Sequence, residues 1–122
     1  MEANNDERKD METRVERDRY GKLSASTVVP LGVDRRELRI ETYKTCNGRV
    51  KCNANVVTVT EHGYQHVMCF AGDRSGDYSK VLAVEAVRAT EKNLRAVHAA
   101  GMEKFDAVMA EVRDWYGIKE AA

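Results

Sequence analysis

One dipeptide, Asn47-Gly48, constrains the fold of this chain more than any other feature. Residues 38–46 before it alternate between apolar and polar side chains and are rich in strand-forming types, and residues 49–60 after it form a second strand-like segment. Asn and Gly tolerate positive φ, which both central positions of a type I′ turn require. We therefore predict a β-hairpin over residues near 37 to 60 that turns at Asn47-Gly48.

The predicted turn also sets a register. A two-residue loop places Lys44 opposite Lys51 and Thr42 opposite Asn53. In that register the apolar residues near the start of the second strand point to one face, whereas Leu38 and the other apolar residues of the first strand point to the other. One register cannot bury both sets, so we predict a β-bulge near residues 53 to 56.

Turn residues indicate two further strands on either side of the hairpin. Residues 24–29 favour a short edge strand that ends at Pro30, which has no N–H to donate to a ladder. A turn at His62-Gly63 leads into a third predicted strand over residues 64–70. The result is an antiparallel meander.

The C-terminal third favours a helix. Residues 80–89 fit either a fourth strand or the start of that helix, and Thr90, a good N-cap, favours the strand. The helix ends at Gly117, a typical C-terminal cap, and Gly101 within its apolar stripe would allow a close approach to the sheet. The stripe follows three- and four-residue spacing through Leu94, Val97, His98, Gly101, Met102, Phe105, Val108, Met109, Val112, Trp115 and Tyr116.

These elements predict an α+β fold, with an antiparallel meander of three or four strands packed against one long C-terminal helix. The chain of 122 residues has room for one domain, which we place at 23–122. Residues 1–22 are almost entirely charged and cannot bury enough surface to offset their conformational entropy. We expect them to be a disordered or loosely helical tail, with ordering on a partner as the alternative.

Charge and cysteine content bear on location and partners. The 20 basic and 20 acidic residues cancel, so electrostatic recognition has to come from a local patch. The three cysteines, an odd number, cannot form a fully paired disulfide framework, and no apolar run approaches the roughly 20 residues of a membrane span. We expect a cytoplasmic protein without membrane contact.

Candidate contact residues gather at the predicted hairpin tip and in the loop 72–77. In the predicted register Lys44, Arg49 and Lys51 share one face, and a basic, polar tip suits phosphates or an acidic protein surface. The simpler interpretation is a solvated edge whose lysines discourage aggregation. The candidate binding residues are Arg39, Tyr43, Lys44, Arg49, Lys51, Asp73, Arg74 and Asp77.

The helix stripe is wide enough to leave apolar surface for a second copy or another protein, which makes a homodimer one expectation. The candidate interface residues are Phe105, Met109, Trp115 and Tyr116.

No catalytic constellation is recognisable, and we expect a protein that is not an enzyme and needs no cofactor. His62, His66 and Cys69 match no standard zinc spacing, so no metal site is predicted. His98 on the helix stripe is expected to be a hydrogen-bonded core histidine.

The segments 38–59 (LRIETYKTCNGRVKCNANVVTV) and 89–112 (ATEKNLRAVHAAGMEKFDAVMAEV) resemble, in size and layout, small accessory proteins of phages and mobile elements, among them anti-CRISPR inhibitors. The resemblance implies a non-enzymatic binding protein that inhibits or occludes a host complex, such as a nucleic-acid-guided defence machine. It also implies a location in the host cytoplasm if a phage encodes the chain. Two alternatives stay open. One is a nucleic-acid-binding module that uses the basic hairpin tip, and the other is a homo-oligomeric structural or assembly component.

Overall fold

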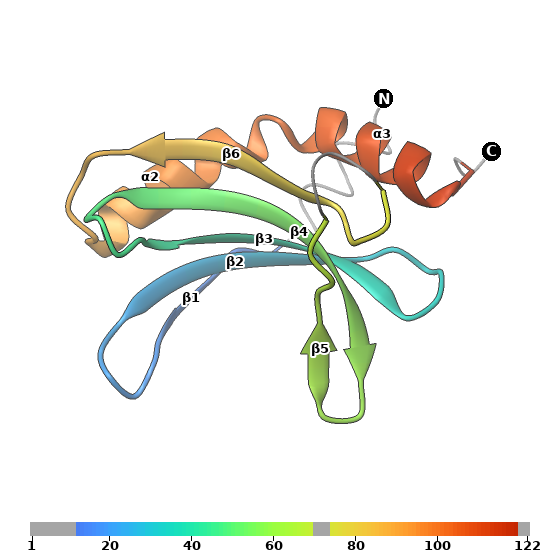
Figure 1. The fold of residues 1–122 in the computed structure, drawn as a ribbon. Coiled ribbons are helices and arrows are strands. Elements are labelled where there is room, and N and C mark those ends of the chain that lie inside the picture. Colours follow the sequence, from blue (N-terminus) through green and yellow to red (C-terminus); the bar gives the residue numbers. More distant parts are fainter. Residues whose placement is uncertain (1–11, 70–73, 120–122) are drawn as a thin grey trace.

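The structure is a computed structural model that describes residues 12–69 and 74–119. It has an α+β fold in which two helices lie on one side of a curled antiparallel sheet (Figure 1). The strands are β1 (Arg14–Arg17), β2 (Leu23–Pro30), β3 (Arg36–Lys44), β4 (Val50–Thr60), β5 (Gly63–Gln65) and β6 (Ser79–Glu85), and the helices are α2 (Glu91–Met102) and α3 (Phe105–Tyr116). This confirms the α+β class and the antiparallel pairing.

Strand order follows the chain from β1 to β4, and the far edge of β4 pairs with two strands, β6 and β5. Its first half pairs with β6, whereas its last three residues pair with β5. The short β4–β5 hairpin projects from the side of the sheet opposite the helices (Figure 1). Within the described residues, no helix is both long enough and apolar enough to cross a membrane.

The hairpin between β3 and β4 has a three-residue loop, Cys46 to Gly48, and not the predicted two-residue turn. The Thr45 N–H donates to the Arg49 carbonyl at 2.7 Å, and the Gly48 N–H donates to the Thr45 carbonyl at 3.1 Å. Only Gly48, with φ +80°, has positive φ in this loop. A turn closed by one left-handed glycine is the usual three-residue hairpin loop.

The extra loop residue moves the register by one position and corrects the predicted pairing. Thr42 lies opposite Cys52, and Ile40 lies opposite Ala54. Since a shift of one residue turns every side chain to the other face, both apolar sets now point to the helices. The bulge predicted for the hairpin is therefore wrong. The irregularity lies between β4 and β6, where Leu82 is the extra residue and is buried in the core.

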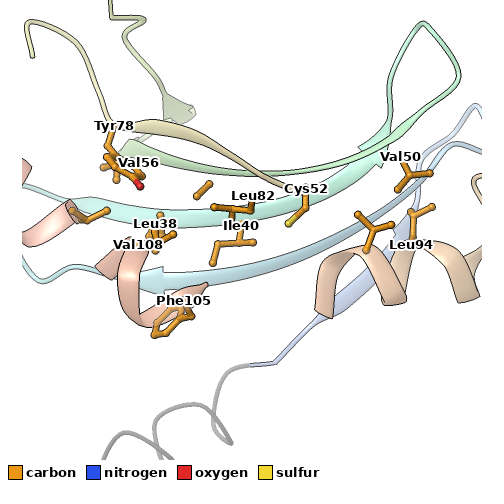
Figure 2. Close-up of a cluster of buried hydrophobic side chains, with 13 residues drawn as sticks. Leu38, Ile40, Val50, Cys52, Val56, Tyr78, Leu82, Leu94, Phe105 and Val108 are labelled. Atoms are coloured by element: carbon orange, nitrogen blue, oxygen red, sulfur yellow. The ribbon is translucent and has the colours of Figure 1, made fainter. Parts of the chain in front are cut away.

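The hydrophobic core fills the space between the sheet and the two helices (Figure 2). Side chains from β3 and β4 meet side chains from β6, α2 and α3 in this layer. The buried cluster consists of Leu38, Ile40, Val50, Cys52, Ala54, Val56, Tyr78, Leu82, Leu94, Val97, Phe105, Val108 and Val112.

The helical region confirms both predicted ends but is interrupted in the middle. The Thr90 side chain accepts a hydrogen bond from the Asn93 N–H, and Gly117 closes α3 in the left-handed conformation. The predicted single long helix is divided at residues 103–104, where the Lys104 N–H donates to the Gly101 carbonyl at 3.0 Å. The Lys104 ammonium reaches the Leu82 carbonyl in β6, which ties the break to the sheet.

Three other strands match their predictions to different degrees. The fourth strand is confirmed as β6. The third predicted strand is shorter, because only Gly63–Gln65 pairs with β4. Residues 14–17, placed in the charged tail, form β1 and pair with β2, with Val15 on the helix side opposite buried Ala25. Residues 1–11 of that tail lie outside the described residues.

Candidate functional site

The face of the sheet turned away from α2 and α3, called here the outer face, carries an ordered set of charged side chains. The observed register places three cations there (Arg14, Arg39 and Lys51) and three anions (Glu16, Glu37 and Glu41). The cations and anions balance. A face with equal numbers of both signs suits a protein surface better than a phosphate backbone.

Arg39 is the centre of this set. Its Nη1 donates to Glu37 Oε2 at 3.1 Å, and its Nε lies 3.6 Å from Glu41 Oε1. The guanidinium also stacks over the Tyr64 ring at 4.4 Å from the ring centre. With only 20% of its side chain exposed, Arg39 is held against the sheet by two carboxylates and one aromatic ring, so little side-chain entropy is left to lose on binding.

Two polar atoms of the outer face are buried without a hydrogen-bond partner in the described structure, the donor Arg39 Nε and the acceptor Asn53 Oδ1. The amide nitrogen of the same side chain, Asn53 Nδ2, donates to the Tyr43 hydroxyl at 3.3 Å. Buried polar groups are normally hydrogen-bonded. The Glu41 carboxylate lies 3.6 Å from Arg39 Nε, just beyond hydrogen-bond distance, whereas Asn53 Oδ1 has no hydrogen-bond partner among the described residues.

Exposed apolar side chains surround this polar centre. Eight large hydrophobic residues are exposed within the described part of the chain, and five of them belong to the outer face. Sheets that face water on one side normally carry polar residues there, so this concentration marks the outer face as different from an ordinary solvated surface. The five are Val28, Val59, Tyr64, Val81 and Val84.

The structure divides the basic hairpin tip that the sequence predicted. Arg39, Tyr43 and Lys51 lie on the outer face, and Tyr43 stands directly opposite Lys51. Lys44 stands opposite Val50, which is buried in the core, so Lys44 points to the helix side. Arg49 lies between the loop and the first residue of β4. The like-charge pair Lys44/Lys51 does not form.

The predicted binding loop is attached to α3. Arg74 pairs with Asp114 at 2.9 Å and stacks on Trp115 at 5.0 Å. Asp77 is only 7% exposed, and its carboxylate accepts the Val67 N–H and the Tyr116 hydroxyl. Asp73 lies outside the described residues.

The candidate interface residues of the helix stripe contact the chain's own core. Phe105 is buried, and Met109, Trp115 and Tyr116 are half-buried against the core cluster. The Tyr116 hydroxyl accepts the Tyr78 N–H at 2.9 Å. Burial raises the pKa of Tyr116 to about 12, and the bond to Asp77 acts in the same direction.

His98 is a hydrogen-bonded core histidine, as predicted, and both of its ring nitrogens have a hydrogen-bond partner. Its Nε2 and Nδ1 lie 2.8 Å from the hydroxyls of Thr27 and Thr42. Burial lowers the pKa of His98, which favours the neutral ring. The two threonines lie 71 and 56 residues away in the chain, so no local sequence pattern could have identified this arrangement.

Within residues 12–69 and 74–119, no group of three or more His, Cys, Asp or Glu side chains could hold a metal ion. His66 Nδ1 instead contacts the Val56 carbonyl at 2.8 Å, and the Cys69 thiol donates to the Asp77 carbonyl at 3.2 Å. Comparison with known proteins found no matching family model, curated protein or solved structure.

Proposed function

We propose that this chain is a non-enzymatic binding protein that uses the outer face of its sheet to occlude the surface of a host protein complex. The observation that carries the proposal is the outer face itself, where exposed apolar residues surround the ordered Arg39. Exposed apolar patches with polar surroundings are typical of protein-interaction sites. Arg and Tyr are the residue types most often found at the energetic centre of such sites.

The partner's chemistry follows from the groups on this face. A protein partner would offer apolar side chains to Val28, Val81 and Val84, which are 38–48% exposed. It would also offer charged groups of both signs to the balanced charges of the outer face. The resemblance to anti-CRISPR inhibitors makes nucleic-acid-guided defence complexes the first partners to test.

A tagged copy of the chain, expressed in cells that carry such a defence complex, tests the proposal. We expect co-purification of the complex and loss of its activity. A Val81→Asp/Val84→Asp variant should lose both effects, because it places two charges in the apolar part of the outer face. Ala96→Asp, an exposed position on α2, is the matched control and should retain both. A wild-type chain that captures no host protein and blocks no defence system would contradict the proposal.

The alternative of nucleic-acid binding by the same face makes a separate prediction. Such binding would weaken steeply with salt, because each neutralised phosphate releases a counterion. The balanced charge of the outer face argues against it. A gel shift at low salt with micromolar chain would detect it, and a shift that Lys51→Ala weakens would favour this alternative over the protein partner.

A further inference from the structure

Three connecting segments of the chain meet at the end of the sheet where β3 turns into β4. They are the β1–β2 turn, the β3–β4 loop and the segment between β6 and α2, all on the left side of Figure 1, and each contributes residues to one pocket. A cavity of about 540 Å³ lies between them, a volume typical of small-ligand sites. Its lining comprises Arg17, Tyr20, Gly21, Lys22, Leu23, Lys44, Thr45, Cys46 and Ala89.

The charge of this cavity is entirely positive. Its lining includes three cations, Arg17, Lys22 and Lys44, and no aspartate or glutamate. Within the described residues none of the three forms an ion pair, and Arg17 donates only to the Gly21 carbonyl at 2.8 Å. The neighbouring Asp18 is not part of the lining, and its carboxylate accepts the backbone N–H groups of Tyr20 and Lys22 and so stabilises the turn.

Sheet register determines the spacing of two of the cations. Arg17 lies opposite Leu23, and the pairing of Ser24 with Tyr43, continued by one residue, places Leu23 beside Lys44. Arg17 and Lys44 therefore stand at the two ends of one cross-strand row, about 10 Å apart at the backbone, which is two strand spacings. Because α2 begins only at Glu91, it leaves this end of the row open.

We infer that this cavity binds a nucleoside polyphosphate. Arg and Lys are the side chains that bind phosphate groups most strongly, and Arg17 and Lys44 are close enough for one polyphosphate group to contact both. Tyr20, which is 79% exposed, lines the same cavity. The Arg19 guanidinium stacks over one face of its ring at 5.0 Å from the ring centre, and the other face is offered to a base. The site lies on the helix side of the sheet, so it is independent of the outer face and of the proposed function.

Calorimetric titration of the full chain at low ionic strength with ADP, pyrophosphate and a single-stranded oligonucleotide tests this assignment. ADP should bind, and Arg17→Ala and Lys44→Ala should each weaken it about tenfold, the effect of losing one charge-assisted hydrogen bond. Tyr20→Ala should weaken ADP more than pyrophosphate. Lys119→Ala, an exposed cation beyond the end of α3, is the matched control and should leave binding unchanged.

Cys46 supplies a second readout, since its exposed thiol lines the cavity whereas Cys69 is half-buried elsewhere. Bound ADP should slow alkylation of Cys46 and leave alkylation of Cys69 unchanged, as measured by peptide mass spectrometry. Three outcomes would overturn the inference. They are no binding at millimolar ADP, equal affinity for ADP and pyrophosphate, or binding of a single-stranded oligonucleotide without binding of ADP.

Discussion

Gly101 in α2 lies directly against Cys52 in β4. A Cβ atom added to the glycine would stand 3.2 Å from the Cys52 Cβ and closer still to the Cys52 sulfur. The predicted close approach of the helix to the sheet is thereby confirmed. At this position of α2 there is room for the hydrogen atom of glycine but not for a larger side chain. Overpacking at such a contact typically destabilises a protein by about 1–3 kcal/mol.

Gly101→Ala should therefore lower the free energy of unfolding, although alanine is the better helix former by roughly 0.5–1 kcal/mol. Cys52→Ala removes the sulfur that the new methyl group would meet. In urea denaturation the double variant should be more stable than the sum of the two single effects predicts. A Gly101→Ala variant that is more stable than wild type would contradict the contact.

His98 should make stability depend on pH. Burial lowers its pKa, so below about pH 6.5 the unfolded chain binds a proton at this ring that the folded chain does not bind. The free energy of unfolding should then fall as pH decreases, by up to about 1.4 kcal/mol per pH unit. Urea denaturation between about pH 7.5 and about pH 5 should show a smaller loss in His98→Gln than in wild type.

Exposed His62 is the matched control for this measurement. The variant His62→Gln should follow the wild-type pH dependence. If His98→Gln loses as much stability as wild type over the same range, the buried neutral ring is not the source of the acid sensitivity.

Tyr116→Phe should destabilise the fold by about 1–3 kcal/mol. The hydroxyl that it removes donates to Asp77 and accepts the Tyr78 N–H, so both groups would be left without this partner at a half-buried site. Thermal or urea denaturation measures the loss. Tyr64→Phe, at a residue that is 52% exposed, should change the free energy of unfolding far less. Equal effects of the two substitutions would argue against the Tyr116 bonds.

The loop between β3 and β4 can be tested by two alanine substitutions. Gly48 has φ +80°, so Gly48→Ala should lower the free energy of unfolding by about 1–2 kcal/mol. Asn47 does not have positive φ, and Asn47→Ala should have a smaller effect. In a type I′ turn both positions have positive φ, so equal losses in urea denaturation would favour the two-residue loop instead.

Local patterns predicted the positions of several elements but not their pairing. The hairpin at Asn47-Gly48, the N-cap at Thr90 and the C-cap at Gly117 depend on residues close in sequence, and the structure contains all three. The register does not follow from the dipeptide, because Asn-Gly fits both a two-residue loop and the end of a three-residue loop. That single position decides which charged residues share the outer face.

Other features depend on contacts that are distant in sequence. Val15 is the only apolar residue of strand β1 that points to the helix side, and the pairing of β1 with β2 determines the conformation of this strand. The break between α2 and α3 lies inside an uninterrupted apolar stripe, where Lys104 reaches the carbonyl of Leu82. The Arg39–Tyr64 stack joins two strands that no local pattern places together, so the centre of the outer face could not be predicted.

Site-specific photocrosslinking tests the outer face most directly. A photoreactive phenylalanine analogue at Tyr64 or Val84 places the reactive group on the outer face, and the same analogue at Ala96 places it on α2. We expect crosslinks from positions 64 and 84 to the host protein that the tagged chain captures, and none from position 96. Crosslinks from position 96 without crosslinks from 64 and 84 would show that the helices, and not the outer face of the sheet, contact the partner.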